Sequence, residues 1–303
     1  MNLLITGGTG FIGSALISSL MKDNHRVVVL TRTAPVSTAF VSLEDLGLIE
    51  IHSLSQLSAL ERFDAVINLA GEPIANKRWS RAQRDKIVAS RINTTQQLID
   101  FFSTLEHKPL TFISGSAVGV YGLGVESNPI NEQCAGDDSF ASQLCQQWEQ
   151  TALQAKALSI RTCLLRTGIV LGQQGALAKM LLPFKLGLGG VIGHGAQWMP
   201  WVHIDDMVGI IRCLIEHQEI EGAVNATAPT PATNREFTQS LGRAVNRPTW
   251  FTMPAFMIKL LMGQMGEELL LSGKRVIPEK LINAGYQFKY QQLDNALGSI
   301  IER

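Results

Sequence analysis

Glycines near the amino end of the chain have the spacing of a loop that binds a diphosphate. TGGTGFIG at residues 6–13 follows a short apolar run and opens a helical pattern. Gly7 permits a tight turn, Gly10 lets the backbone approach a diphosphate, and Gly13 lets the helix pack against the strand. Free N–H groups at a helix start favour negative charge. The pattern therefore predicts a dinucleotide site to which five residues contribute: Gly7, Gly10, Phe11, Ile12 and Gly13.

The residues after the next apolar run distinguish NAD from NADP. Val27–Leu30 is followed by Thr31 and Arg32, and the first acidic residue beyond them is Glu44. An NAD site places Asp or Glu near this point to hold the ribose hydroxyls, whereas a planar guanidinium suits a 2′-phosphate. We therefore expect NADP(H) in preference to NAD(H), with Thr31 and Arg32 beside the adenosine. A solvated surface arginine is the alternative.

A further candidate cofactor segment ends another apolar run. Leu69, Ala70 and Gly71 are small or apolar, and at the carboxyl end of a parallel strand they leave room for the ribose and nicotinamide. An ordinary turn between a strand and a helix is the alternative. Arg91 lies three residues after the apolar Val88 in a helical pattern, so it either reaches the cofactor or is solvent-facing or paired.

The elements that position these residues alternate between apolar runs and amphipathic segments. Runs without polar alternation indicate strands buried on both faces, and strands alternating with helices indicate a parallel sheet covered by helices. We therefore predict an α/β fold, a Rossmann-type doubly wound parallel sheet. Its expected strands are 3–5, 27–30, 65–69, 110–113 and 161–170, and its expected helices are 11–22, 79–106 and 140–156.

The pattern changes after residue 170. We predict a dinucleotide-binding domain at 1–170 and a smaller α/β C-terminal substrate domain at 171–303, with a segment at about 201–226 returning to the first. Later helices are expected at about 205–217, 234–245, 254–271 and 291–302. The glycine-rich stretch 187–195, followed by Gln197 and Trp198, forms either a lid over the nicotinamide or a structural turn.

Composition excludes several classes of protein. The chain has 303 residues, with 26 basic and 26 acidic, and is 46% hydrophobic. The neutral balance argues against binding to nucleic acid or to an anionic membrane surface, and the apolar content argues against disorder. The four cysteines form no C-x-x-C pair, so we expect no metal site. Because no signal peptide and no membrane-spanning apolar run is found, we expect a cytoplasmic protein.

Several motifs together resemble a known family. TGGTGFIG, NLAG, RINTTQQL, SAVGVYG (116–122), LRTGIVLG (165–172) and WVHIDD (201–206) occur in the order typical of extended short-chain dehydrogenases/reductases. The chain is most similar to an epimerase-like branch, related to cell-division-inhibitor homologues, which has its own C-terminal domain, here 250–303. The resemblance implies NADP(H) and a substrate cleft between the two parts. Within LRTGIVLG we count Arg166 among the cofactor-binding residues.

The chain departs from the family at the catalytic pair. The family uses a tyrosine with a lysine four residues later, whose charge lowers the tyrosine pKa. Tyr121, Tyr286 and Tyr290 are each followed, four residues on, by a residue other than lysine. By resemblance, Cys145 and Glu149 occupy the places of the tyrosine and the lysine. An acidic group there would raise the pKa of a neighbouring acid.

The chain has other candidate catalytic residues that do not form such a pair. By resemblance, Ser116 could hydrogen-bond a carbonyl and Tyr121 would face the substrate. Cys145 and Glu149 lie one helical turn apart and could both face the cleft, or be a packed thiol and a solvated carboxylate. Three further residues are assigned lesser roles: Asn93 holding a water, and His203 and Asp205 structural, with Asp205 capping the helix that follows.

Three functions remain open from the sequence. The first is an NADP(H)-dependent oxidoreductase acting on a small carbonyl or alcohol, and the second is a cofactor-binding regulator without turnover. The third is a nucleotide-sugar epimerase, which the absence of Lys or Arg between Lys185 and Arg212 disfavours because a sugar diphosphate needs cations. We expect a small-molecule substrate and a monomer or homodimer.

Overall fold

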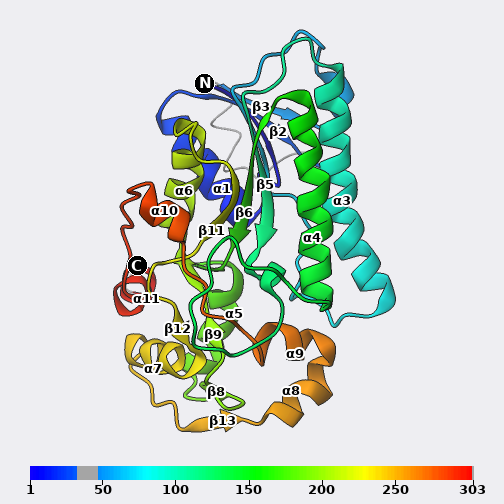
Figure 1. Ribbon diagram of the computed structural model, residues 1–303. Helices are drawn as coiled ribbons and strands as arrows, with labels where there is room; N and C mark the ends of the chain where they lie inside the picture. Colours follow the sequence, from blue (N-terminus) through cyan, green and yellow to red (C-terminus); the bar gives the residue numbers. More distant parts are fainter. Residues whose placement is uncertain (33–46, 302–303) are drawn as a thin grey trace.

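A seven-stranded parallel sheet forms the centre of the molecule (Figure 1). The computed structural model describes residues 1–32 and 47–301. The strand order is β11-β6-β5-β4-β1-β2-β3, and every neighbouring pair is parallel. This order confirms the predicted doubly wound Rossmann-type sheet. The strands are β1 (Asn2–Thr6), β2 (Arg26–Leu30), β3 (Leu48–Ile51), β4 (Ala65–Asn68), β5 (Thr111–Ala117), β6 (Arg161–Thr167) and β11 (Gly222–Ala226).

Both faces of the sheet are buried, which explains the apolar runs in the sequence. Alternate residues of a strand point to opposite faces. Leu3 and Ile5 of β1 therefore pack in one core, whereas Leu4 packs in the other. All three side chains are fully buried.

Two pairs of helices cover these faces, and Figure 1 shows the pairs on opposite sides of the sheet. The core of Leu3 and Ile5 is completed by α1 (Phe11–Lys22) and α6 (Ile204–Glu216), and that of Leu4 by α3 (Arg81–Thr104), with α4 (Phe140–Leu153) also on that side. The expected helix at 79–106 begins later, at Arg81, because the Ser80 hydroxyl accepts a hydrogen bond from the Gln83 N–H and caps it.

Two expected elements are divided by glycines. The strand expected at 161–170 ends at Thr167, and β7 (Ile169–Leu171) turns away to pair with β10 (Trp201–His203). Between them Gly168 donates its N–H to the Ala226 carbonyl. The helix expected at 254–271 is two helices, α8 (Ala255–Met262) and α9 (Gln264–Leu270), because Gly263 has a φ of 61°.

The carboxyl-terminal part has short strands and a core of its own. Phe184, Trp201, Phe237 and Leu297 are buried together there. The chain crosses back into the large sheet through β11 before it forms the last helices. The elements of this part are α5 (Gly175–Lys185), β8 (Gly190–Ile192), β9 (Trp198–Met199), β12 (Ala232–Thr233), α7 (Asn234–Ala244), β13 (Phe251–Met253), α10 (Glu279–Asn283) and α11 (Leu293–Ile301). Among the described residues no helix is long and apolar enough to cross a bilayer.

Candidate functional site

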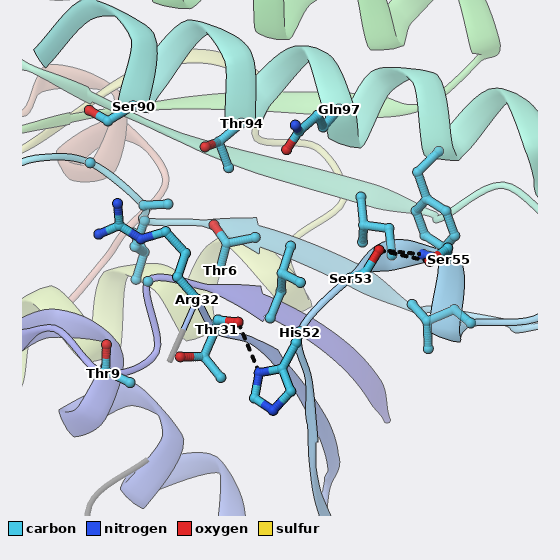
Figure 2. Close-up of a pocket in the computed structure, with 18 of the residues that line it drawn as sticks. Thr6, Thr9, Thr31, Arg32, His52, Ser53, Ser55, Ser90, Thr94 and Gln97 are labelled. Atoms are coloured by element: carbon cyan, nitrogen blue, oxygen red, sulfur yellow. Dashed lines mark hydrogen bonds between the residues drawn. The ribbon is translucent and has the colours of Figure 1, made fainter. Parts of the chain in front are cut away.

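A cleft of about 780 Å³ lies at the carboxyl ends of β1, β2, β3 and β4 (Figure 2). Seven of the residues expected to bind a cofactor line it: Gly7, Gly10, Thr31, Arg32, Leu69, Ala70 and Gly71. They come from three separate segments of the sequence, and the parallel sheet brings these segments to one edge. Crevices of this kind, outside the carboxyl ends of the strands, are where ligands bind in open α/β sheets.

Gly7 and Gly13 of the glycine loop have no room for a Cβ. A Cβ at Gly7, whose φ is +71°, would lie 2.6 Å from the Leu69 carbonyl carbon, and one at Gly13 would lie 2.3 Å from the Gly7 oxygen. Gly10 precedes α1, and no described side chain caps this helix. The first N–H groups of α1, at Phe11 and beyond, are therefore available to an anion in the cleft. The cradle fits a diphosphate.

One end of the cleft lies beyond β2 and β3. Arg32 is exposed and lines this end, and the imidazole Nδ1 of His52 lies 3.2 Å from the Thr31 carbonyl oxygen. The Ser53 and Ser55 hydroxyls are 2.8 Å apart on the same wall. His52, Ser53 and Ser55 are not among the residues predicted from the sequence, although the end of the third strand could have indicated them. Glu44 lies outside the described residues.

The opposite end of the cleft rests on a buried hydrogen-bonded chain. The Thr6 hydroxyl donates to Asn68 Oδ1 at 2.6 Å, and Asn68 Nδ2 donates to Thr95 Oγ1 at 2.9 Å. Trp148 Nε1 donates to the same Thr95 oxygen at 2.9 Å. These contacts connect β1, β4, α3 and α4 beneath Leu69–Gly71, so this wall is fixed by side chains from four elements.

Arg91 lies behind this wall and is not itself part of the lining. Its Nη1 donates to the Glu72 carbonyl at 3.0 Å and to the Ile87 carbonyl at 3.1 Å. The guanidinium packs over the Trp148 ring at 5.3 Å. A Cβ at Gly71 would lie 3.0 Å from Arg91 Cζ, so the glycine is what allows the guanidinium to come this close to the cleft. Arg91 therefore contributes positive charge at this end.

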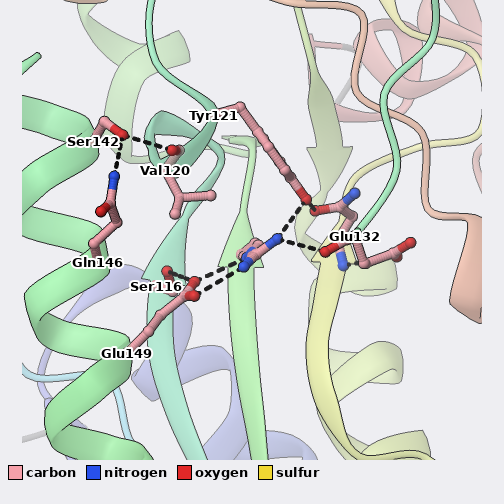
Figure 3. A network of polar contacts seen from close by, with 9 residues as sticks. Ser116, Val120, Tyr121, Glu132, Ser142, Gln146 and Glu149 are labelled. Atoms are coloured by element: carbon pink, nitrogen blue, oxygen red, sulfur yellow. Dashed lines mark hydrogen bonds and ion pairs between the residues drawn. The ribbon is translucent and has the colours of Figure 1, made fainter. Parts of the chain in front are cut away.

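Three of the catalytic candidates and Arg166 belong to a second, buried cluster (Figure 3). Arg166 Nε and Nη2 donate to the two Glu149 oxygens at 2.9 Å and 2.8 Å. Ser116 donates to Glu149 Oε1 at 2.7 Å, and Arg166 Nη1 donates to the Tyr121 hydroxyl at 3.0 Å. Glu149 is 8% exposed, so it does not lie on a solvated helix face. The structure places Arg166 here and not in the lining of the cleft.

The cluster continues into the carboxyl-terminal part of the chain. Tyr121 donates its hydroxyl to Asn225 Oδ1 at 2.6 Å, and Asn225 Nδ2 donates to the Ile277 carbonyl at 2.9 Å. Glu132 accepts from the Asn225 N–H at 3.1 Å, and its own carbonyl accepts from Arg166 at 2.9 Å. Each polar group of the cluster is thereby held by several partners.

The Tyr121 hydroxyl and the nearby Cys145 thiol keep their protons at neutral pH, because burial raises both pKa values. Burial raises the pKa of Tyr121 to about 12, although the Arg166 guanidinium opposes the shift. Burial, with a smaller contribution from the Glu149 charge, raises the pKa of the Cys145 thiol to about 11. Helix α4 contains neither tyrosine nor lysine. The arrangement therefore lacks the family's proton relay, and neither Tyr121 nor Cys145 lines the cleft.

The remaining residues singled out by the sequence have other positions. His203, not Asp205, caps α6, because its Nδ1 accepts from the Asp205 N–H at 3.0 Å. The imidazole stacks on the Tyr290 ring, with 3.9 Å between centroids. Asn93 is exposed on α3. The glycine-rich stretch forms β8 and a turn, and the buried Gln197 amide donates to the Ile192 and Leu270 carbonyls.

The sequence matches two families along its length. Residues 3–226 match the NAD dependent epimerase/dehydratase family, and residues 253–300 match a domain of unknown function, DUF1731. Epimerase family protein YfhF of Bacillus subtilis is 36% identical over 99% of this chain and 98% of that protein. Epimerase family protein SDR39U1 of Homo sapiens is 35% identical over 99% of this chain and the whole of that protein.

Solved structures agree with these matches. The crystal structure of human SDR39U1 (isoform 2) with NADPH has a TM-score of 0.88 at 35% identity and full coverage of both chains. A nucleoside-diphosphate sugar epimerase from Corynebacterium glutamicum has a TM-score of 0.78 at 27% identity, over 99% of this chain and 58% of that chain. The resemblance drawn from the motifs is confirmed: the chain belongs to the NAD dependent epimerase/dehydratase family and carries a DUF1731 region at its carboxyl end.

Proposed function

We propose that this chain binds NADP(H) in the cleft and transfers hydride between it and a small carbonyl or alcohol. The observation that carries the proposal is the glycine cradle, where Gly7 and Gly10 bring backbone to the cleft beside the start of α1. The relative crystallised with NADPH supports the choice of cofactor. Arg32 supports it further, because a guanidinium at this end suits a 2′-phosphate.

Each end of the cleft has its own role in this proposal. The N–H groups at the start of α1, from Phe11 onward, hold the diphosphate, and Arg32 with His52 borders the adenosine. Leu69–Gly71 border the nicotinamide, which when bound supplies or accepts the hydride. Arg91 places a fixed positive charge behind Gly71, where it favours the negative charge that develops on a carbonyl oxygen during reduction.

The proton that carbonyl reduction requires has to come from a donor other than the tyrosine–lysine pair of the family. Ser116 donates its hydroxyl hydrogen to Glu149, and Tyr121 donates its own to Asn225, so both protons are engaged in buried bonds. We therefore assign proton delivery to a water in the cleft. A positioned side-chain acid contributes roughly 10²–10⁴ in rate, so this reaction is expected to be slow.

Calorimetric titration with NADPH and NADH tests the binding step. We expect NADPH to bind about tenfold or more tightly, because one charge-assisted hydrogen bond to the 2′-phosphate accounts for that ratio. Equal affinity for the two cofactors would contradict the NADP(H) assignment, and no binding of either would contradict the whole proposal.

A second candidate, cofactor binding without turnover, is favoured by the Glu149–Arg166 ion pair that lies where a catalytic lysine is expected. A panel of small aldehydes and ketones with NADPH distinguishes the two, because only the oxidoreductase oxidises NADPH. Inert substrates throughout, with intact binding, would favour the second candidate. Conversion of a UDP-sugar with a retained cofactor would instead identify an epimerase.

A further inference from the structure

Exposed apolar side chains gather at the end of the molecule that carries β13 and α8. This apolar end is formed by seven residues that are 40–88% exposed: Trp250, Phe251, Met253, Phe256, Met257, Leu260 and Leu261. Figure 1 shows β13 and α8 at the end of the molecule opposite β2 and β3. The apolar end is therefore remote from the cofactor cleft.

The sequence of α8 indicates that this surface is covered in the working protein. AFMIKLLM is apolar on every side except at Lys259, and a helix of that kind is normally buried all round. Within the chain only Ile258 of α8 is buried. Phe256, Met257, Leu260 and Leu261 recur at the spacing of one helical face, and all four are exposed.

The area of the apolar end is that of a stable protein interface. From their exposed fractions, its seven residues present on the order of 900 Å². A standard interface buries about 800 Å² on each partner, whereas the largest apolar patch of a monomer is typically about 300–600 Å². The area thus exceeds what a free monomer usually leaves in water and matches one side of an interface.

The charge of the apolar end suits an identical partner. Between Trp250 and Met262 the sequence contains one charged residue, Lys259, and its ammonium pairs with Glu267 of the same chain at 2.7 Å. Two copies of this surface therefore meet without like-charge repulsion. A partner that binds through complementary charges, or an anionic bilayer, would instead require several charged residues on this surface.

The backbone of β13 also suits a twofold partner. Among the described residues β13 pairs with β8 alone, so it is an edge strand, and all three of its residues are exposed. An edge strand placed antiparallel to its own copy about a twofold axis pairs the same N–H and C=O groups on both sides. The outer face of α3 is polar by contrast, because it carries the exposed residues Asp85, Lys86, Asn93 and Asp100. That face therefore suits a second copy less well than the apolar end does.

We propose that the apolar end binds a second copy of this chain about a twofold axis beside β13, giving a homodimer whose two cofactor clefts lie at its outer ends. This inference does not depend on the proposed reaction, because neither β13 nor α8 lines the cleft.

Sedimentation velocity of the full chain, at about 1–100 µM, tests the proposal. We expect a species with the mass of two 33.1 kDa chains whose share rises with concentration. The double variant Phe256→Glu/Leu260→Glu places like charges on both sides of the interface and is expected to raise the dimer dissociation constant at least about 100-fold. Both positions are about 70% exposed, so the monomer should keep its fold, which circular dichroism checks.

A matched control separates this interface from a general effect of surface charge. Leu60 and Leu110 are each 63% exposed and lie outside the apolar end, so Leu60→Glu/Leu110→Glu should leave the dimer intact. Trp250→Ala, a milder change at an 88% exposed side chain, should weaken the dimer about tenfold or more. A monomer at every concentration, or a dimer that survives Phe256→Glu/Leu260→Glu, would overturn the proposal.

Discussion

Glu149 and Arg166 form a two-pronged ion pair, with N···O distances of 2.9 Å and 2.8 Å, beneath the carboxyl end of the sheet. Their side chains are each only 10% exposed. The family resemblance places a lysine where Glu149 lies, so the sign of the charge on α4 is reversed and Arg166 on β6 neutralises it. The positive charge beside Gly71 in the cleft comes instead from Arg91 on α3.

Breaking that ion pair should destabilise the fold. Glu149→Gln leaves the Arg166 guanidinium buried without a counter-charge, and we expect a loss of about 3 kcal/mol in the free energy of unfolding, measured with urea. The matched control is Asp294→Asn, which removes the carboxylate of the exposed Arg243–Asp294 pair and should cost less than about 1 kcal/mol. Equal losses in the two variants would refute this account of the cluster.

The glycine cradle predicts that one methyl group abolishes tight cofactor binding. In Gly13→Ala the new Cβ would lie 2.3 Å from the Gly7 oxygen, so the loop has to move away from the helix start. We expect NADPH affinity, measured by calorimetry, to fall about 100-fold, which corresponds to the loss of about two charge-assisted hydrogen bonds to the diphosphate. Gly298→Ala has nothing within 4 Å of its Cβ and should bind normally.

The choice between the two cofactors should depend on Arg32. Replacing it by serine removes the guanidinium that we assign to the 2′-phosphate, so NADPH affinity should fall about 10- to 100-fold while NADH affinity stays the same. Arg62→Ser, at an exposed site outside the cleft, is the control. A parallel loss for NADPH and NADH would show that Arg32 does not read the 2′-phosphate.

Alkaline pH should weaken the fold through the buried thiols. Burial raises the pKa of Cys145 to about 11 from an ordinary value of 9.0, so the folded state holds the proton more tightly than the unfolded state. The associated stability is complete below about pH 9 and is lost as the pH rises to about 11. Urea unfolding should show this decline, and Cys145→Ser should reduce its slope.

Two observations bear on that alkaline decline. Cys163 has a similarly raised pKa of about 11 through burial, so part of the slope should remain in Cys145→Ser. Cys134 is exposed, and Cys134→Ser should leave the pH dependence unchanged. If the free energy of unfolding were flat between pH 9 and 11, the buried, protonated state of Cys145 would be disproved.

Local patterns were enough to predict the parallel sheet type, five of its seven strands and the glycine loop, but not the positions of β3 and β11. Apolar runs such as 65–69 and the glycines at 7, 10 and 13 impose their geometry within a few residues. The other parts of the site depend on contacts between distant segments. His52 lies beside Thr31 only because β3 pairs with β2, and Glu149 meets Arg166 only because α4 packs near β6.

The helices at the apolar end show the limit of periodicity. Residues 254–271 have a nearly continuous apolar pattern, which predicts one helix, but the positive φ of Gly263 divides it. The periodicity of apolar residues indicates which face of a helix is apolar, but it does not indicate whether another part of the protein covers that face. The exposure of Phe256 and Leu260 therefore becomes visible only in the folded chain.

Asn225 accepts a hydrogen bond from Tyr121 and donates one to the backbone carbonyl of Ile277, so it links the two regions of the chain. A gene fragment ending at residue 226 would encode the whole sheet yet leave the Asn225 amide without the carbonyl that orients it. Recombination that exchanged the carboxyl-terminal region for an unrelated one would have the same effect. We therefore expect the two regions to depend on each other for their final fold, although each matches a separate family.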